Sequence, residues 1–381
     1  MKNDDVAGTA VDRRRFLGSA ALGAAGVALG STACAGPDGG GSAAVQTRPS
    51  VQWRLASSFP RSLDTLYGTA ERLATLLEQL TEGRFMIRSY AAGEIVPPLQ
   101  VLDAAQQGTV QVGHSPGYYY TGKNEALAFD TGVPFGLTAR QQDAWLYEGG
   151  GLDLMRGVYS DFGIINFPGG NTGAQMGGWF KREIGSLAEL RGMKMRIPAM
   201  GGAVMNRLGV TVQVLGGGEI YPALERGAID ATEWVGPHDD EKLGFQNAAR
   251  FYYYPGWWEP GPSMSFMVNR QAWDALPSSY QQAFEIAARA AAASTLIMYD
   301  KLNPEALERL VAGGTQLRRY PDDVMRQAEV ITDELLEESA SRDARFRTIL
   351  SAYRAFREDS YRWFGTSEQA FAAYAFGRAD G

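Results

Sequence analysis

The fold class is decided by the stretch from Met195 to Ala231, which reads MRIPAMGGAVMNRLGVTVQVLGGGEIYPALERGAIDA. Strand and helix patterns alternate along this stretch and just beyond it, over 194–198 (strand), 200–208 (helix), 211–214 (strand), 219–226 (helix) and 229–234 (strand). Alternation at such short intervals is typical of a parallel sheet that carries helices on its faces. The stretch therefore predicts an α/β lobe.

The chain between positions 51 and 120 shows the same alternation. Strand patterns cover 51–59, 85–90 and 110–114, with helix patterns between them. Open parallel sheets bind ligands at the carboxyl ends of their strands. We therefore expect another α/β lobe here, with its ligand edge in the loops at 57–60, 91–93 and 115–120.

The last third of the chain is mainly helical. An aromatic-rich stretch over 251–268 is expected to return the chain to the first lobe. A long Ala-rich helix is predicted over 279–310, and apolar residues from Phe346 to Phe356 mark one face of a C-terminal helix.

The first 35 residues are interpreted as an export signal rather than as part of the fold. Asp12-Arg13-Arg14-Arg15-Phe16-Leu17 resembles a twin-arginine motif, and a short Gly/Ala-rich apolar stretch follows it. Cys34 leaves two processing routes open. Ser31-Thr32-Ala33-Cys34 resembles a lipoprotein cleavage box, although Ser31 stands where that pattern has Leu, whereas Ala33-Cys34-Ala35 fits release of a soluble protein. Residues 36–50 are Gly/Ser-rich and predict a flexible linker.

Charge and cysteine content narrow the function class. The formal net charge is −7, and removing Met1 to Cys34 takes away four bases and three acids, which leaves −8. An acidic balance of this size argues against nucleic acid as a partner. Cys34 is the only cysteine, so no disulfide forms within the chain and stability must come from the core.

No motif of an enzyme or of an organic cofactor site is present. The chain has only two histidines, His114 and His238, which makes a zinc site improbable. No Gly-x-Ser-x-Gly elbow, Walker loop or dinucleotide fingerprint occurs. The run Gly216-Gly217-Gly218 precedes a helix and fits a tight turn better than a phosphate cradle.

Two motifs in the opening stretch carry a family resemblance. Arg196-x-Pro198 and the segment Glu219-Ile220-Tyr221-x-Ala223-Leu224-x-x-Gly227-x-x-Asp230 resemble the solute-binding subunits of TRAP transporters, which take up organic acids. The resemblance extends over essentially the whole chain after the linker. It implies an exported protein, in the periplasm or at the outer face of the cytoplasmic membrane, that hands a small carboxylate to a membrane permease.

The resemblance also implies the architecture. We expect an α/β fold of the periplasmic-binding-protein type (class II), with two lobes, a hinge and a long C-terminal helix. Lobe I is assigned to 51–173 and 262–300, lobe II to 174–261 and 301–340, and a C-terminal helical extension to 341–381. Closure of the two lobes around the ligand is expected to be a hinge motion.

Arg196 is the predicted anchor for the substrate carboxylate. In the family that it resembles, the arginine at the end of this strand pairs with the carboxylate. The chemistry agrees independently, because a planar guanidinium matches a carboxylate with two parallel hydrogen bonds. A surface ion pair would be the ordinary role of an arginine without this motif.

A bound cation is predicted beside the substrate. The segment Asn171–Phe180 resembles members that bind 2-oxo and 2-hydroxy acids, some of them together with a cation. Carried over by position, the ligands are the side chains of Gln175, Glu233 and Glu259 and the backbone carbonyl of Trp234. All are oxygen atoms, as Na⁺ or Ca²⁺ requires.

Charge balance supports this cation. The formal charges of Glu233, Glu259, the substrate anion and Arg196 add up to −2. Ca²⁺ neutralises this charge and Na⁺ does not. Without a cation the two carboxylates would repel the substrate. Either glutamate is otherwise an ordinary loop acid.

Further substrate contacts are predicted from polar and aromatic side chains near these positions, namely Gln175, Asn171, Trp234, Tyr119 and Trp258. Which acid binds cannot be fixed from sequence, because one methylene changes affinity only modestly.

Two other function classes stay open. An exported enzyme could use Glu233 and Glu259 as an acid and base pair on a sugar or lactone. A sensor module could use the same cleft. The C-terminal segment is more aromatic than a solvated tail needs. The resemblance implies a homodimer, because similar members dimerise through a long C-terminal helix, and capping of the protein's own first lobe is the alternative. We expect a binding protein without enzymatic activity.

Overall fold

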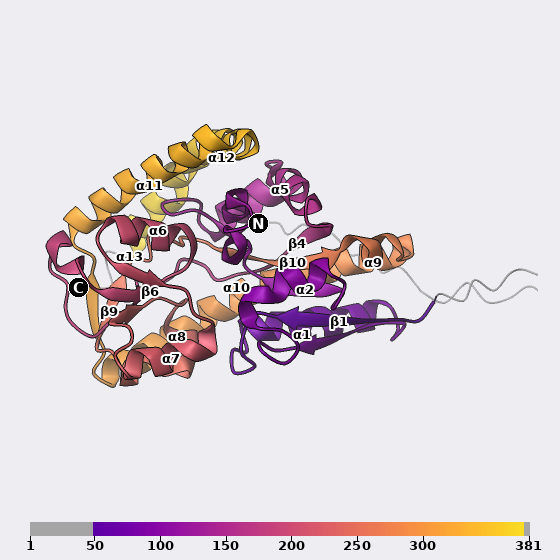
Figure 1. The fold of residues 1–381 in the computed structure, drawn as a ribbon, viewed down its shortest axis with the longest axis horizontal. Coiled ribbons are helices and arrows are strands. Elements are labelled where there is room, and N and C mark those ends of the chain that lie inside the picture. The colour runs from indigo at the N-terminus through magenta and orange to yellow at the C-terminus, as the bar shows by residue number, and fades with distance from the viewer. Residues whose placement is uncertain (1–48, 377–381) are drawn as a thin grey trace, which may run out of the picture. The chain divides into compact units, whose positions relative to one another are not determined.

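The computed structural model describes residues 49–376. The predicted export signal, Cys34 and nearly all of the predicted linker lie outside the described residues. The described part contains two β-sheets, each covered by helices (Figure 1). This agrees with the two-lobed α/β architecture expected from the sequence.

The first sheet has five strands in the order β2-β1-β3-β10-β4. Their bounds are β1 Val51–Ser57, β2 Phe85–Tyr90, β3 Val112–Ser115, β4 Ile164–Asn171 and β10 Ser263–Asn269. β1 pairs in parallel with β2 and β3, whereas β10 runs antiparallel to both of its neighbours. The chain therefore returns to this sheet from a distance of about ninety residues, as the aromatic-rich stretch predicted.

The second sheet has six strands in the order β11-β9-β5-β8-β6-β7. Their bounds are β5 Trp179–Phe180, β6 Lys194–Arg196, β7 Thr211–Gln213, β8 Ala231–Thr232, β9 Phe251–Tyr254 and β11 Gln316–Arg319. β6 pairs in parallel with β7 and β8, and β5 is antiparallel to β8 and β9. The carboxyl ends of β6 and β8 consequently lie side by side, which brings Arg196 and Glu233 to one edge.

Helices form at the predicted positions, and further helices form where none was predicted, the longest of them over Asp322–Arg342. The α-helices are α1 Leu66–Leu80, α2 Val101–Gln106, α3 Ala128–Thr131, α4 Ala139–Tyr147, α5 Gly151–Ser160, α6 Ala199–Arg207, α7 Gly217–Glu225, α8 Pro237–Leu243, α9 Arg270–Asp274, α10 Ser278–Ala312, α11 Asp322–Arg342, α12 Ala344–Phe364 and α13 Ala370–Phe376. Short 3-10 turns include η2 Gly117–Tyr120 and η3 Glu125–Leu127.

Two strands are much shorter than the sequence predicts. The predicted strand over 229–234 forms only at Ala231–Thr232. The alternation over 174–180 predicts a further strand, which forms only at Trp179–Phe180. Gly178 has a positive φ of 87°, and a Cβ there would lie 2.6 Å from the carbonyl oxygen of Thr232. The chain therefore bends where it approaches β8 closely, and this bend places the preceding loop at the strand ends.

The hydrophobic core is divided among both lobes and the contact between them. The Ala-rich face of α10 packs Ala283, Ala287 and Ala291 against the first sheet. One cluster joins Phe59 and Leu63 of the first lobe to second-lobe residues that include Trp179 and Ile220. The two lobes thus share buried apolar surface near the predicted ligand edge.

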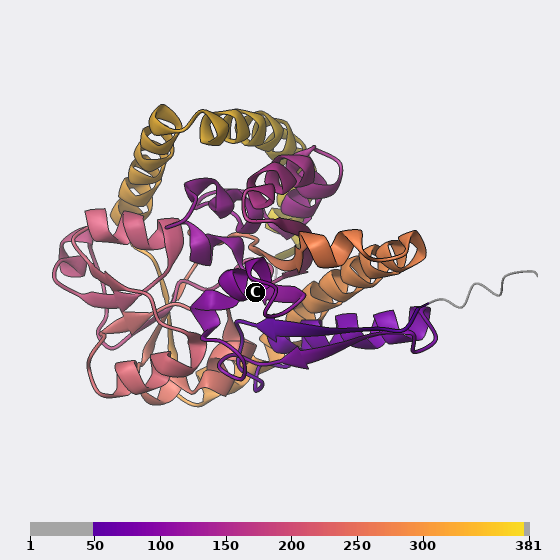
Figure 2. The same ribbon diagram turned by 45° about the vertical axis from the view of Figure 1, so that its right-hand side comes forward.

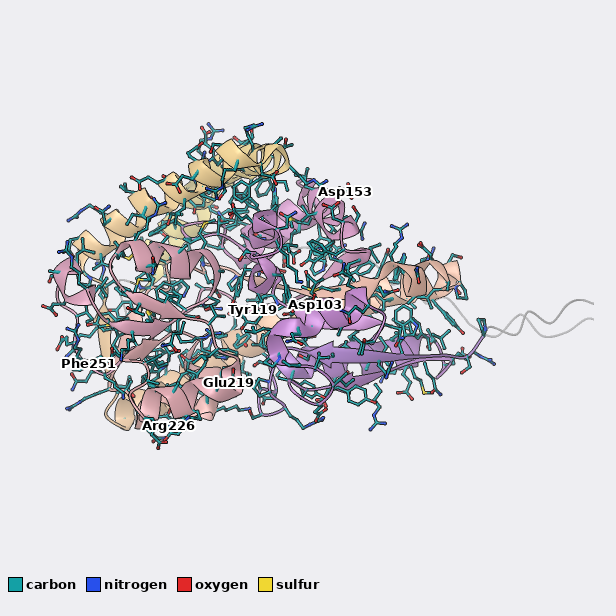
Figure 3. All side chains as sticks on the ribbon, viewed as in Figure 1. Asp103, Tyr119, Asp153, Glu219, Arg226 and Phe251 are labelled. Carbon is teal, nitrogen blue, oxygen red and sulfur yellow. The ribbon has the colours of Figure 1, made fainter. Side chains whose placement is uncertain are left out.

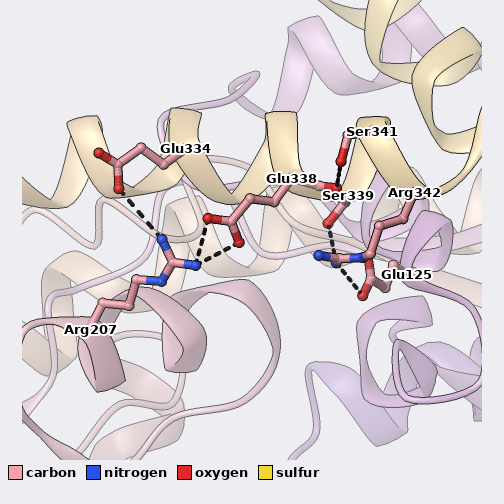
Figure 4. A network of polar contacts seen from close by, with 7 residues as sticks. All are labelled: Glu125, Arg207, Glu334, Glu338, Ser339, Ser341 and Arg342. Atoms are coloured by element: carbon pink, nitrogen blue, oxygen red, sulfur yellow. Dashed lines mark hydrogen bonds and ion pairs between the residues drawn. The ribbon is translucent and has the colours of Figure 1, made fainter.

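Helix α11 makes ion pairs to both lobes (Figure 4). Glu334 and Glu338 of α11 pair with Arg207 of α6, and Arg342, the last residue of α11, pairs with Glu125 of η3. Helix α12 then packs against α4 and α5, as the yellow end of the ribbon shows (Figure 2). Exposed pairs of this kind contribute little energy each, so they orient α11 more than they stabilise it.

Among residues 49–376, no helix is long and apolar enough to span a membrane.

Candidate functional site

Arg196 lies at the carboxyl end of β6 and is only 1% exposed. Its Nε donates to the carbonyl of Leu215 at 3.1 Å, and Nη1 donates to the carboxylate of Glu233. Nη2 donates to the hydroxyl of Tyr119 at 3.3 Å. A buried guanidinium held in this way is a fixed cation in the interior, unlike the many exposed arginines of the surface.

The surroundings of Arg196 keep it charged. Burial disfavours the charged guanidinium, but Glu233 and Tyr119 outweigh burial and raise the pKa of Arg196 above its ordinary value. The guanidinium also lies 5.1 Å from the ring centroid of Trp234, in a cation–π contact. Tyr119 reaches it from the first lobe, between the two sheets (Figure 3).

Backbone hydrogen bonds bring three loops together at this edge. The N–H of Gln175 donates to the carbonyl of Glu259 at 3.2 Å, and the N–H of Gly256 donates back to the carbonyl of Gln175 at 2.9 Å. The N–H of Glu233 donates to the carbonyl of Arg196 at 3.2 Å. These bonds fix the loops that carry the predicted cation ligands.

The same three loops contain buried acceptor oxygens without hydrogen-bond partners. They are Oε1 of Gln175, Oε2 of Glu233 and Oε2 of Glu259. A buried polar atom without a partner is costly, and most buried polar atoms in proteins are paired. Among residues 49–376, no group of three or more His, Cys, Asp or Glu side chains is placed so that it could hold a metal ion. The present set consists of two carboxylates and an amide, a donor chemistry that fits a hard cation.

The two glutamates have perturbed pKa values. Burial raises the pKa of Glu233 to about 7, although Arg196 opposes this shift. Burial and the nearby Glu233 together raise the pKa of Glu259 well above its ordinary value. Two buried acids that repel each other form a site at which a positive charge is strongly favoured.

A narrow cavity of about 10 Å³ adjoins Arg196. Residues of both lobes line it, namely Phe59, Leu66, Tyr118, Tyr119, Gln175, Arg196, Trp234, Val235 and Met264. Its lining combines the polar groups of Arg196 and Gln175 with an apolar wall of aromatic and aliphatic side chains. This combination suits a small anion with a short apolar group.

Two predicted contact residues lie outside the cavity wall. The side-chain amide of Asn171 donates to the carbonyl of Gly261 at 3.0 Å, and its oxygen accepts from the N–H of Gly173 at 2.9 Å. Trp258 is buried in the core of the second lobe, where it packs against Trp257 and Tyr320. Both residues therefore support loops near the site, and neither lines the cavity in this structure.

Sequence reasoning missed most of the apolar wall. Phe59, Leu66, Val235 and Met264 come from four separate elements, and none stands in a recognisable motif. The sequence gives one indication of these residues, which is their position. Phe59 and Tyr118 fall in loops that are expected at the ligand edge of the first sheet.

The Gly-rich turn before α7 makes room for Trp234. A Cβ on Gly217 would lie 2.8 Å from the indole ring of Trp234. Glu219 accepts a hydrogen bond from the N–H of Gly216 at 2.9 Å and caps the helix. The run of glycines thus serves close packing of an aromatic wall residue, in agreement with the predicted tight turn.

Comparison with known proteins identifies relatives along nearly the whole chain. The profile of bacterial extracellular solute-binding proteins, family 7, matches residues 56–343. The monocarboxylate 2-oxoacid-binding periplasmic protein of Nostoc sp. (strain PCC 7120) is 53% identical over 364 residues, which cover 95% of this chain and 98% of the relative.

Solved structures of TRAP transporter solute-binding proteins have the same fold. The protein from Bordetella bronchiseptica is 46% identical with a TM-score of 0.86, and the match covers 87% of this chain and 99% of that chain. That structure is a mixed-occupancy dimer with copurified calcium and picolinate bound in one site and the other site empty. The protein from Pseudoalteromonas atlantica, with bound sodium and pyruvate, is 38% identical with a TM-score of 0.82, covering 84% and 98%. The chain therefore belongs to the bacterial extracellular solute-binding proteins of family 7.

Proposed function

We propose that this protein captures a small 2-oxo or 2-hydroxy monocarboxylate together with Na⁺ or Ca²⁺ and delivers it to a TRAP-type membrane permease. One observation carries the proposal: three buried oxygens without partners lie on loops that converge beside a fixed, buried guanidinium. The names of the Nostoc and Pseudoalteromonas relatives, which mention 2-oxoacids and pyruvate, support the same substrate class.

The substrate carboxylate is assigned to Arg196. Its Nη2 donates a hydrogen bond only to the hydroxyl of Tyr119, at the long distance of 3.3 Å. This nitrogen is therefore available to donate to a substrate carboxylate. Oxygen atoms of Gln175, Glu233 and Glu259 would hold the cation, which supplies positive charge to the 2-oxo or 2-hydroxy oxygen of the substrate. The apolar wall then faces the methyl or short alkyl end.

A second charged group on the substrate is disfavoured by the same wall. Phe59, Leu66 and Met264 offer no hydrogen-bond partner to a distal carboxylate. Burying an unpaired charge against such a surface costs several kcal/mol. We therefore expect dicarboxylates to bind much more weakly than monocarboxylates.

Binding is coupled to closure because both lobes line the cavity. Tyr119 of the first lobe contacts Arg196 of the second lobe, and the rings of Phe59 and Trp234 approach edge to face at 6.5 Å. A ligand that touches both lobes stabilises the closed arrangement relative to the open one. The closed surface is then what the permease can distinguish from the open protein.

Calorimetry on protein treated with EDTA tests this proposal. Pyruvate with added Ca²⁺ or Na⁺ should bind at one site per chain with micromolar or tighter affinity. Arg196→Ala and Arg196→Lys should each weaken binding by more than about a hundredfold, since neither retains the guanidinium fork. Arg207→Ala, which removes an exposed arginine of α6, is the matched control and should bind normally. Unchanged affinity in both Arg196 variants would reject the assignment.

We propose no covalent chemistry at the site. The relatives are binding proteins, and the two glutamates are explained by cation binding. Pyruvate recovered from the complex should be unaltered by NMR after prolonged incubation. Product formation that disappears in Glu233→Gln would instead favour the alternative of an acid and base pair.

We also propose a homodimer formed through the C-terminal helices. Trp363, Phe371 and Phe376 are more than 60% exposed, whereas their apolar neighbours in α12 are buried in the protein's own core. An exposed aromatic set of this kind is typical of a surface that is covered by another chain. Light scattering at micromolar concentration should give the mass of a dimer, and Phe371→Ser with Trp363→Ser should give a monomer.

A further inference from the structure

Phe135, which contacts the loop that carries Glu259, has an unusual backbone conformation. Its φ is +53°, a region that bulky side chains rarely occupy. Its N–H donates to the carbonyl of Trp257 at 2.8 Å, and its ring stacks on the indole of Trp257 with centroids 5.4 Å apart and planes 14° apart. Strain that is held by specific contacts marks a position that the surrounding structure constrains.

Helix α12 holds the other side of the same segment. The hydroxyl of Tyr361 lies 2.6 Å from the carbonyl oxygen of Gly136 and 3.0 Å from that of Phe135. Arg357 donates to the carbonyl of Phe135 at 3.3 Å, and the hydroxyl of Tyr353 accepts from the N–H of Leu137 at 2.9 Å. Three side chains of one helix therefore fix the backbone at 135–137.

The loop that carries Glu259 rests on this fixed segment at two points. Trp257 contacts Phe135, two residues before Glu259. Two residues after Glu259, a Cβ on Gly261 would lie 2.2 Å from the backbone nitrogen of Ala139, so the two backbones touch. Any shift of the segment at 135–139 must therefore move the loop of Glu259 or break its packing.

We infer that Tyr361 is a positioning residue for the cation site, acting through Phe135 and Trp257 on the carboxylate of Glu259. The inference rests on the proposed role of Glu259 as a cation ligand. Helix α12 lies beyond the part of the chain that the family profile matches. The inference gives this helix a role in ligand affinity in addition to its role in packing. Tyr361 itself contacts neither substrate nor cation.

The test compares two tyrosines whose hydroxyls donate to backbone carbonyls. Tyr361→Phe should weaken Ca²⁺ binding about fivefold in calorimetry at saturating pyruvate, because losing one hydrogen bond loosens the segment under Glu259. Tyr280→Phe removes the bond from Tyr280 to the carbonyl of Pro49 at 2.8 Å, which lies in the first lobe and away from the lining of the cavity. It should leave the Ca²⁺ affinity within twofold of the parent.

A purely structural role for Tyr361 predicts a different pattern. It would lower the melting temperature of the EDTA-treated protein and leave the Ca²⁺ affinity unchanged, and that result would overturn the inference. Glu259→Gln separates the two proposals. Loss of Ca²⁺ binding in Glu259→Gln with normal binding in Tyr361→Phe leaves the proposed function intact and removes the positioning role. Normal Ca²⁺ binding in Glu259→Gln removes both.

Discussion

Two groups of buried acids in the second lobe differ in how their oxygens are satisfied. At the cleft, Glu233 and Glu259 each keep one carboxylate oxygen without a partner. In α8, Asp239 accepts from the hydroxyls of Thr65 at 2.6 Å and Tyr299 at 2.7 Å. Asp240 of the same helix accepts bonds on both of its oxygens.

The contrast separates acids that are proposed to bind a cation from acids whose oxygens are satisfied within the fold. Asp240 receives hydrogen bonds from the indole of Trp179, the hydroxyl of Tyr252 and the N–H of Val235. Burial nevertheless raises its pKa to about 7, the same value as for Glu233. A perturbed pKa alone therefore does not distinguish the two groups. What distinguishes them is the unsatisfied oxygen, which a folded protein tolerates where a ligand supplies the missing charge.

The largest expected effect is on Ca²⁺ affinity, after substitution of the two cleft glutamates. Glu259→Gln and Glu233→Gln keep the shape and remove one charge, so each should weaken Ca²⁺ binding by about a thousandfold, measured by calorimetry with pyruvate present. Asp240→Asn is the matched control, since it removes an equally buried charge from the satisfied group, and should change Ca²⁺ affinity by less than about fivefold. Equal losses in all three variants would show that buried charge in general, rather than ligation, governs the site.

The second effect is on stability, after substitution of an acid in α8. Asp240→Ala leaves the indole N–H of Trp179 and the hydroxyl of Tyr252 without a partner in the interior. The free energy of unfolding in urea should fall by about 3 to 5 kcal/mol. Tyr252→Phe, which removes one donor, should cost about 1 kcal/mol. A loss of ligand affinity without a loss of stability would contradict the structural role of Asp240.

The sequence contains motifs around the proposed site residues but none that marks α8. Arg196, Gln175, Glu233 and Glu259 stand in or near recognisable motifs at strand ends, and the structure places them on converging loops. Helix α8 reads Pro-His-Asp-Asp-Glu-Lys-Leu, which lacks an apolar stripe and gave no helical signal. It forms because buried partners from distant elements satisfy its acids.

The same limit applies to the cavity wall. The positions of Asn171 and Trp258 near the motifs suggested substrate contacts, yet a loop can turn either way at a strand end. Asn171 uses its amide to fix a turn, and Trp258 turns into the core. Side-chain direction at loops depends on packing between segments far apart in the sequence, which no local pattern contains.

A buried acid in the first lobe sharpens the comparison through pH. Asp130 accepts from Ser265 at 2.6 Å, from Tyr159 at 2.8 Å and from Asn166 at 2.9 Å. Burial raises its pKa to about 6 from the ordinary 3.8, although all three partners oppose the shift. The folded protein holds this proton more tightly than the unfolded chain, so the resulting stability is present below pH 3.8 and is lost as the pH rises through about 6.

Asp130→Asn should therefore cost more at pH 4 than at pH 7. The two costs should differ by about 2 to 3 kcal/mol, measured as free energies of unfolding in urea at both pH values. All other titrating groups are shared by the parent and the variant and cancel in the comparison. A cost that is equal at both pH values would show that Asp130 is already ionised throughout this range.

The smallest effect concerns the hydrogen bond from Thr65, which connects the α8 group to the other lobe. Thr65 precedes α1 of the first lobe, and its bond to Asp239 crosses to the second lobe. Thr65→Val keeps the shape but removes the donor, so it should weaken pyruvate binding about fivefold by disfavouring the closed arrangement. In an open protein, water can satisfy the freed oxygen of Asp239, so unfolding of the ligand-free protein should change little. Thr65→Ser, which restores a hydroxyl, should recover the affinity in calorimetry. Thr65→Val could instead lower the free energy of unfolding and leave the pyruvate affinity unchanged. That result would mean that the bond between Thr65 and Asp239 persists in the ligand-free protein. Helix α8 would then stabilise the contact between the lobes in both states and would not favour closure.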